Sequence, residues 1–245
     1  MSSGKYSALS GALSRLKMMD SISDNLANSK TVGFKKSQAA FEARLSEAMG
    51  SRDNGLFSLT DLKEGFTDQS QGPLIRTDVA THVAINGEGY FKVQDENGQP
   101  YYTRQGNFKV DESGALTTSL GMKVLGDGGQ PIVLSSADVS IDEQGNILLE
   151  DGGTVKLALF RFSDESVVVR KGGGLFTVSA EDIKAFERPV PEPKLVQGQI
   201  EDSNVNMMQE MARMMEATRV FEACQKAIKN YSTLDSKAVE LGRLG

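Results

Sequence analysis

The chain has 245 residues, 39% of them apolar and 24% charged, which is enough to bury a hydrophobic core without disulfides or metals. Its formal net charge of -6 lies in the middle: residues 1–75 carry 9 basic and 8 acidic side chains, residues 199–245 carry 6 and 7, and the segment between them carries 12 and 18. An acidic middle between near-neutral ends has no basic stripe for a phosphate backbone, so nucleic acid is excluded as a partner.

The N-terminal segment has the spacing of an amphipathic helix, which we expect over roughly residues 3–27. Its apolar side chains recur every three or four positions and therefore share one helical face. After Tyr6 these positions are Leu9, Leu13, Leu16, Met19, Ile22 and Leu26.

A turn follows this helix and leads into a connecting segment over residues 37–75. In the turn, Gly33 predicts a positive φ or a sharp exit from the helix, and Phe34 is an apolar anchor. We predict a further helical stretch over 37–49, through Phe41, Leu45 and Met49, and a loop at 50–55.

Short apolar alternations punctuated by glycine then predict a central, mainly antiparallel all-β domain over residues 76–188. Three turns share one form, an aspartate followed three positions later by glycine, and begin at Asp95, Asp111 and Asp142. The predicted strands are 81–85, 90–93, 101–104, 107–110, 116–118, 123–125, 132–134, 139–141, 147–149, 155–160, 167–169 and 175–178.

Residues 189–199 form a connector in which three prolines favour an extended polyproline conformation. A long C-terminal helix is predicted within residues 200–245, because no glycine or proline occurs from Gln199 to Leu241. The segment Asp202–Asn204 supplies its candidate N-cap.

Two adjacent apolar seams run along this C-terminal helix, and both alternate steps of three and four. The first seam is Met211, Met214, Thr218, Phe221, Gln225 and Ile228. The second seam is Ala217, Val220, Cys224, Ala227, Tyr231, Leu234, Ala238 and Leu241.

A helix of about 34 residues is roughly 50 Å long, more than the diameter of a domain of this size. Part of its apolar face would therefore stay exposed unless another subunit covered it. We predict an α+β fold in which the N- and C-terminal helices pair as a coiled coil. The alternative is an ordinary monomer, with one seam filled by the N-terminal helix and the other by the β domain.

The sequence contains no arrangement that points to catalysis. His82 is the lone histidine and Cys224 the lone cysteine, so no cluster has metal-ligand spacing. Gly87–Gly89 reads as a turn rather than a phosphate loop. The acidic pairs Asp142–Glu143 and Asp164–Glu165 lie in turn-like contexts, although a carboxylate pair for glycoside hydrolysis stays open. We predict no catalytic, cofactor-binding or metal-binding residues, and no enzyme.

The N-terminus lacks the apolar run and cleavage site of a secretory signal peptide. No stretch reaches the 18 apolar residues of a membrane span. These features alone indicate a cytoplasmic protein.

Three blocks of sequence nevertheless resemble the signatures of bacterial flagellar axial proteins. The first, MDSISDNLANSKTVGFK at residues 19–35, resembles their N-terminal signature, with Asp24 where the family often has asparagine. The second is VAINGEGYF at 83–91 with YTRQGNFKVDESGAL at 102–116, and the third is IEDSNVN at 200–206.

Within this family the chain resembles the rod proteins of the flagellar basal body. The short length and the compact path from residue 33 to residue 65 favour a rod protein over a hook protein. The last helix reads TRVFE at 218–222, where the distal rod protein tends to have QRAYE, so the resemblance favours a proximal rod subunit. The distal rod subunit is the alternative.

The resemblance implies export without a cleaved signal through the flagellar type III apparatus, and assembly into the rod that spans the periplasm and transmits torque from motor to hook. It implies as partners copies of the chain, other rod proteins, hook–basal body and ring components, and the export apparatus in transit. It places these residues at subunit interfaces: Leu9, Leu13, Leu16, Met19, Ile22, Asn25, Leu26, Asn28, Gly33, Phe34, Asn204, Asn206, Met211, Met214, Val220, Phe221, Cys224, Ile228, Tyr231 and Leu234.

Two other classes of protein stay open. One is an oligomeric module that binds or cleaves cell-wall glycan, with Tyr90, Tyr101 and Tyr102 as candidate sugar contacts. The other is a monomeric β domain clasped by its own termini.

Overall fold

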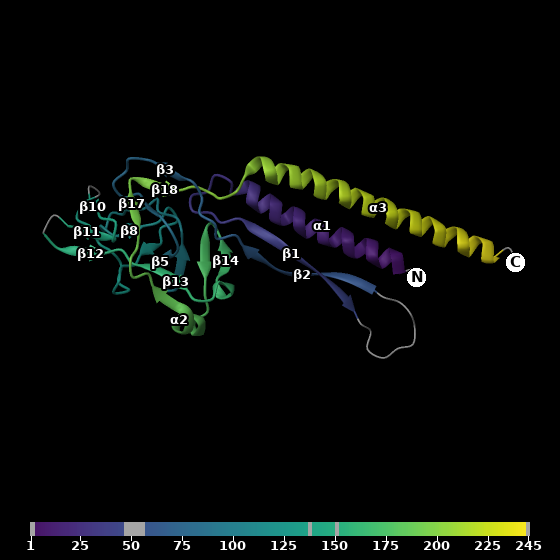
Figure 1. The fold of residues 1–245 in the computed structure, drawn as a ribbon, viewed down its shortest axis with the longest axis horizontal. Helices are drawn as coiled ribbons and strands as arrows, with labels where there is room; N and C mark the ends of the chain where they lie inside the picture. The colour runs from purple at the N-terminus through teal and green to yellow at the C-terminus, as the bar shows by residue number, and fades with distance from the viewer. Residues whose placement is uncertain (1–2, 47–56, 137–138, 150–151, 244–245) are drawn as a thin grey trace. The chain divides into compact units, whose positions relative to one another are not determined.

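The computed structural model describes residues 3–46, 57–136, 139–149 and 152–243, and the chain divides into two compact units (Figure 1). The terminal unit takes in residues 1–27, 37–68 and 206–245. The central unit takes in residues 28–36 and 69–205.

The terminal unit is built on two long helices, α1 (Ser3–Ala27) and α3 (Met207–Arg243), as the sequence predicts. The helices lie side by side and antiparallel (Figure 1), since Gly4, Gly11 and Asn25 of α1 lie against Tyr231, Cys224 and Glu210 of α3, in reverse order. A Cβ atom added at Gly4 would lie 2.5 Å from the Tyr231 hydroxyl, and one added at Gly11 would lie 3.5 Å from the Cys224 sulfur. The two glycines therefore mark where the Tyr231 and Cys224 side chains of α3 pack against α1.

The predicted helix over 37–49 is wrong, because this segment forms strand β1 (Ser37–Ser46). It pairs antiparallel with β2 (Phe57–Thr67), and both strands contact α1. Its apolar residues Phe41, Ala43 and Leu45 satisfy a strand period of two as well as a helical spacing of four, so periodicity alone does not separate the two. Met49 and the predicted loop at 50–55 lie outside the described residues.

The central unit is a set of short antiparallel strands with two short helical segments, η1 (Glu165–Val167) and α2 (Ala180–Phe186). Its strands are β3 (Leu74–Arg76), β4 (Val83–Ile85), β5 (Tyr90–Gln94), β6 (Pro100–Thr103), β7 (Lys109–Val110), β8 (Leu116–Thr117), β9 (Lys123–Val124), β10 (Ser140–Ile141), β11 (Asn146–Leu148), β12 (Thr154–Lys156), β13 (Leu159–Phe162), β14 (Val169–Gly172), β15 (Leu175–Thr177), β16 (Glu187–Pro189), β17 (Leu195–Gln197) and β18 (Gln199–Glu201).

The strands form one large sheet and three small ones. The large sheet has the order β14-β15-β6-β5-β9-β8-β7, and β13 pairs with β5 and with β16. The small sheets are β10-β11-β12, β17-β4 and β18-β3. The last two matter for the site, because they bring the end of the central unit's chain back against its beginning.

Several predicted strands need correction. The single strand predicted at 155–160 is two strands, β12 and β13, separated by the buried residues Leu157 and Ala158. The strand predicted at 167–169 is the end of η1 followed by β14. The strand predicted at 132–134 is reduced to one isolated bridge, between Val133 and Ala115. Helix α2 was not predicted, although the Ser179 side chain caps it by accepting from the Asp182 amide at 3.2 Å.

Two apolar clusters fill the central unit. The larger cluster includes Phe91, whose ring meets the Phe108 ring edge-on at a centroid distance of 5.0 Å. The smaller is aromatic, and in it Tyr102 and Phe162 make a similar contact at 4.8 Å.

The three aspartate turns have the repeated form that the sequence predicts. In each, the aspartate Oδ1 accepts hydrogen bonds from the backbone amides two and four positions later, at 2.7–3.0 Å. The glycine in each turn has a φ of 80–84°. Only glycine adopts this conformation without steric cost, which fixes the spacing of the motif.

These hydrogen bonds make the three turns sensitive to acid. The pKa values of Asp95, Asp111 and Asp142 lie below the ordinary value, chiefly because the carboxylates accept from the Gln99 amide, the Ser113 hydroxyl and the Asn146 side-chain amide respectively. A depressed pKa contributes stability above the unfolded-state value, and this stability is lost as the pH falls through the folded-state pKa.

We therefore expect the protein to lose stability below about pH 4 partly through these turns. Replacing all three aspartates by asparagine retains an acceptor oxygen in each turn but removes its titration. The melting temperature of the triple variant should change less between pH 5 and pH 2.5 than that of the wild type. Equal slopes in the two proteins would contradict this account of the turns.

Candidate functional site

Helix α1 carries an apolar stripe whose side chains stay about half exposed. The stripe has heptad spacing and its side chains are 41–52% exposed; it consists of Tyr6, Leu9, Leu13 and Leu16. We call it the N-terminal stripe. Farther along the predicted face the side chains turn inward, since Ile22 is buried and Met19 and Leu26 are half-buried. The apolar face of α1 was predicted as a single surface, but it is exposed as far as Leu16 and turned toward the interior beyond it.

A buried polar contact holds the C-terminal end of α1 inside the terminal unit. Asn25 is 1% exposed, and its amide nitrogen donates to the Ser37 carbonyl at 2.8 Å and to Glu210 Oε2 at 3.3 Å. Its amide oxygen accepts from the Ser37 backbone amide at 2.9 Å, and Glu210 Oε1 accepts from Arg213 at 3.0 Å. This contact joins α1, β1 and the first turn of α3, and so fixes their register within the terminal unit.

The second seam of α3 faces α1. Its members Cys224 and Tyr231 lie opposite Gly11 and Gly4, and Ala217 is buried. The first seam is less covered: Met211, Thr218 and Gln225 are exposed. The other predicted interface residues of α3 are half-buried apart from Leu234, which is 62% exposed; they are Met214, Val220, Phe221 and Ile228.

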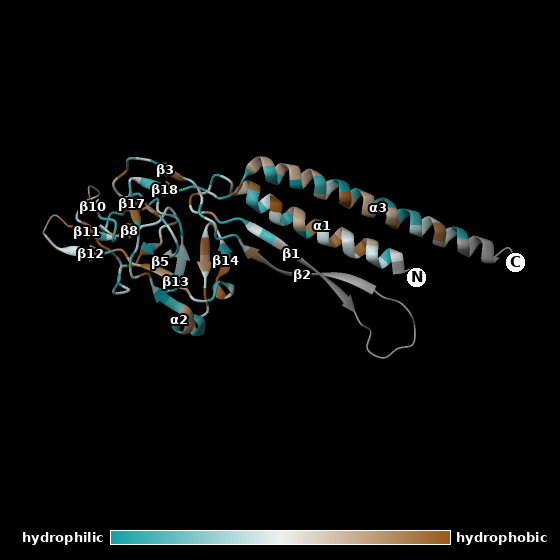
Figure 2. Ribbon diagram, in the orientation of Figure 1, coloured by the Kyte–Doolittle hydropathy of each residue, from teal (hydrophilic) through white to brown (hydrophobic). Residues whose placement is uncertain are grey.

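Sequence reasoning missed an apolar face at the start of α3. Its members are 37–76% exposed, and we call them the methionine face: Met207, Met208, Met211 and Met215. Apolar positions recur along both helices in Figure 2. The steps of three and four from Met208 to Met211 to Met215 could have revealed this face, but only Met211 falls on a predicted seam.

In the central unit, the other predicted residues gather around a buried carboxylate. Glu201 Oε1 lies 2.6 Å from Lys35 Nζ, and Glu201 Oε2 lies 3.1 Å from an Arg104 guanidinium nitrogen. All three side chains are at most 4% exposed. Glu201 Oε1 also accepts from the Gly72 amide at 2.9 Å, and Lys35 donates to the Ser70 carbonyl at 2.7 Å. We call this group the Glu201 cluster.

The turn residues Gly33 and Phe34 lie beside the Glu201 cluster. Gly33 has a φ of 65°, and its amide donates to the Glu201 carbonyl at 2.7 Å. A Cβ at Gly33 would lie 2.5 Å from the Arg104 carbonyl carbon. Phe34 is 2% exposed, with the Arg170 guanidinium 4.3 Å from its ring centroid. The predicted positive φ and apolar anchor are confirmed.

Asparagines hold the two ends of the same region. Asn204 Oδ1 accepts from the Lys36 amide at 2.7 Å, and the Asn28 side chain accepts from the Thr31 hydroxyl at 3.2 Å. Because Asn204 is engaged in this way, the predicted N-cap at 202–204 is wrong. The cap of α3 is Asn206, whose side-chain oxygen accepts from the Gln209 amide at 3.2 Å.

Three separated sequence blocks thus meet in one place within the central unit. Gly33 to Lys35 come from the first block, Arg104 from the second and Glu201 to Asn204 from the third. These are the blocks that carry the resemblance noted from sequence. Their shared task is to hold two chain segments, 28–36 and 201–205, side by side.

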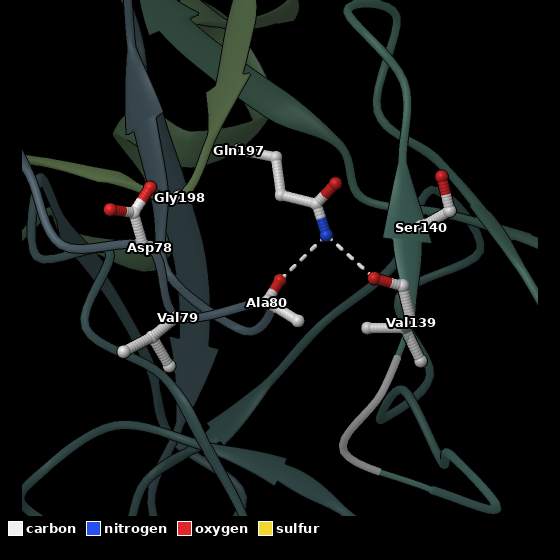
Figure 3. A pocket seen from close by; sticks show the side chains of 7 residues that line it. All are labelled: Asp78, Val79, Ala80, Val139, Ser140, Gln197 and Gly198. Carbon is white, nitrogen blue, oxygen red and sulfur yellow. Dashed lines mark hydrogen bonds between the residues drawn. The ribbon is translucent and has the colours of Figure 1, made fainter.

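A shallow pocket elsewhere in the central unit shows no reactive arrangement (Figure 3). The Gln197 amide nitrogen donates to the Ala80 carbonyl at 2.8 Å and to the Val139 carbonyl at 2.6 Å, so the amide joins the pocket walls. Its lining residues are Asp78, Val79, Ala80, Val139, Ser140, Gln197 and Gly198. Within the described parts of the chain, no three His, Cys, Asp or Glu side chains are grouped so that they could hold a metal ion.

The residues proposed for glycan chemistry have structural roles. Tyr90, Tyr101 and Tyr102 are at most 4% exposed, so their rings cannot stack on a sugar. Asp142 organises its turn, and Asp164 caps η1 by accepting from the Ser166 amide at 2.9 Å. His82 Nδ1 lies 2.9 Å from the Thr77 hydroxyl, and burial lowers the pKa of its ring.

Across the described residues, none of the helices combines the length and apolar character needed to span a membrane.

Fold and site together define a structural protein whose two chain ends form one helical unit with exposed apolar faces. Comparison with known sequences agrees. The model of the flagellar hook protein FlgE/F/G D1 domain matches residues 84–156, and that of the flagellar basal body rod FlgEFG protein C-terminal region matches residues 196–241.

Similar proteins extend over nearly the whole chain. The flagellar basal-body rod protein FlgF of Rhizobium meliloti (strain 1021) is 30% identical, with 98% of each chain covered. FlgF of Caulobacter vibrioides is 31% identical, covering 100% of this chain and 99% of the relative. The rod protein FlgG of Buchnera aphidicola subsp. Acyrthosiphon pisum is 31% identical, covering 92% and 93%. The chain belongs to the flagellar basal-body rod protein family.

The Glu201 cluster generates a prediction about stability. Glu201→Gln removes the buried charge that Lys35 and Arg104 contact, and should lower the free energy of unfolding by about 3–5 kcal/mol in denaturant titrations. The control is Asp78→Asn, which breaks an exposed ion pair with Arg76 of the same 2.6 Å length. That change should cost far less, because solvent screens an exposed pair. Similar small losses in both variants would refute the assigned role.

The position of Gly33 leads to a further prediction about stability, and a glycine with a similar φ serves as its control. Gly33→Ala combines an unfavourable φ with a backbone clash and should cost about 2–4 kcal/mol. Gly129 has a φ of 70° but nothing within 4 Å of an added Cβ, so Gly129→Ala should cost only about 1–2 kcal/mol. Chemical denaturation measures both, and an equal cost would show that the Arg104 backbone does not restrict Gly33.

Proposed function

We propose that the protein is a structural subunit of the flagellar basal-body rod. It assembles helically through its terminal helices into the drive shaft that transmits torque from motor to hook. The observation that carries this proposal is that a member of a rod protein family exposes apolar faces on the helices at both ends of its chain. Covering these faces with neighbouring subunits removes apolar side chains from water, which drives association.

In this proposal the terminal segments, residues 1–36 and 200–245, form the inner layer of the rod. The segment 37–75 connects them to the outward-facing β domain at 76–188, and 189–199 leads back toward α3. A head-to-tail contact between identical subunits that does not close produces a filament. The N-terminal stripe and the exposed part of α3 supply such contacts, whereas the buried members of the predicted interface, Ile22, Asn25, Gly33 and Phe34, pack within the subunit.

We further propose that α1 and α3 pair as a coiled coil. The spacing of their contacts supports this, because Gly4 and Gly11 are seven residues apart and so are their partners Cys224 and Tyr231. Heptad-spaced contacts keep two long helices in register along their length, which suits a shaft loaded in torsion.

Within the rod, we propose the proximal position, that of FlgF. Relatives named FlgF and FlgG are about equally similar to this chain, so the support comes from the departure at Thr218–Glu222 from the distal pattern. The partners are then copies of the chain, other rod proteins, and hook and ring components. The subunit reaches the rod through the flagellar export apparatus without loss of a signal peptide.

The test places a charge in the N-terminal stripe. Leu16 is 41% exposed, so Leu16→Asp should leave both units folded, with unchanged circular dichroism, yet abolish incorporation into basal bodies and swimming. The control, Leu148→Asp, changes a 59% exposed leucine on β11 of the central unit and should preserve motility. Normal motility with Leu16→Asp would overturn the proposed assembly contact.

A further inference from the structure

The methionine face differs chemically from the N-terminal stripe. Both are apolar and exposed, but the stripe is mostly leucine, whereas every member of the face at the start of α3 carries a thioether sulfur. Met208 is 76% exposed, Met215 is 58% exposed and Met211 is 46% exposed. Methionine packs adaptably against irregular surfaces, and unlike leucine it is readily oxidised.

Other methionines of the terminal unit are placed differently. Met18 is half-buried, and its sulfur accepts a hydrogen bond from Arg15 at 3.3 Å. Met19 is also half-buried, and its sulfur accepts from the Thr218 hydroxyl at 3.6 Å. These two sulfurs are engaged inside the unit, whereas Met208, Met211 and Met215 are open to an oxidant in solution.

We propose that Met208, Met211 and Met215, the three most exposed members of the methionine face, form an oxidation-sensitive site that controls addition of the subunit to the rod. The co-reactant is a peroxide. One oxygen atom passes from hydrogen peroxide to the thioether sulfur, giving a sulfoxide and water, so that sulfur loses two electrons and the peroxide is reduced. Sulfoxide reductases reverse the reaction.

The effect on assembly follows from polarity. A sulfoxide carries a strong hydrogen-bond acceptor, and burying it in an apolar contact without a donor is unfavourable. Three sulfoxides within two turns of α3 would turn the apolar face into a polar one. The inference rests on the proposed function, since it concerns the state of the face before neighbours cover it; in an assembled rod the same sulfurs would be shielded.

The first experiment maps the reaction. The purified full-length protein is treated with graded hydrogen peroxide, and oxygen addition at each methionine is followed by peptide mass spectrometry. We expect Met208, Met211 and Met215 to oxidise at least five times faster than Met18, Met19 and the half-buried Met122 of the central unit. Equal rates at all these positions would overturn the assignment of a selective site.

The second experiment measures assembly. Cosedimentation of the protein with basal bodies isolated from cells lacking this subunit should fall at least ten-fold after peroxide treatment, and recover after treatment with sulfoxide reductase. The triple variant Met208→Leu, Met211→Leu, Met215→Leu keeps an apolar face and should bind equally before and after peroxide. The matched control Met122→Leu should remain sensitive.

The outcomes separate the two proposals. If oxidised wild-type protein binds as well as untreated protein, the oxidation site is refuted while the rod function stands. If the triple variant loses binding on oxidation as the wild type does, the sensitive groups lie elsewhere and the inference fails. If untreated wild-type protein does not bind at all, the proposed function fails and the inference fails with it.

Discussion

The structure depends on how one buried carboxylate is neutralised. Glu201 lies at the end of β18, and in water its charge would need no partner; at 1% exposure it needs several. Lys35 and Arg104 supply two positive charges from segments that are remote in sequence, and the Gly72 amide supplies a further donor. Because a buried ion cluster is strongly destabilised when one member is missing, the three segments are obliged to fold together.

The terminal unit solves a different problem, because its helices must contact one another and still offer apolar faces for assembly. Small and large residues of α1 serve these two tasks separately. Gly4 and Gly11 on α1 lie against the Tyr231 and Cys224 side chains of α3, while the leucines of the N-terminal stripe stay exposed. At the C-terminal end of α1, the Asn25–Ser37–Glu210 contact replaces apolar packing with directional hydrogen bonds. These bonds specify the register of α1, β1 and α3 more strictly than leucines would.

Elements marked by a regular spacing of residues could be predicted from sequence, whereas features that depend on tertiary contacts could not. The two terminal helices and the three aspartate turns follow from spacing and turn chemistry. The β1 segment was misread because Phe41 and Leu45 fit two periods, and only pairing with β2 decides between them. The cap at Asn206 was missed because Asn204 is occupied by Lys36, a contact across 168 positions. Met208 and Met215 were missed because the predicted seams started from other residues.

The antiparallel pairing of α1 and α3 has a practical consequence for labelling. Since Gly4 lies against Tyr231, the start of α1 and the end of α3 lie at the same end of the terminal unit (Figure 1). An affinity tag or fluorescent protein fused to either terminus would therefore extend from the same end of the terminal unit. The turn at Gly128 and Gly129 in the central unit, where an added Cβ has no atom within 4 Å, is a better place for an inserted label.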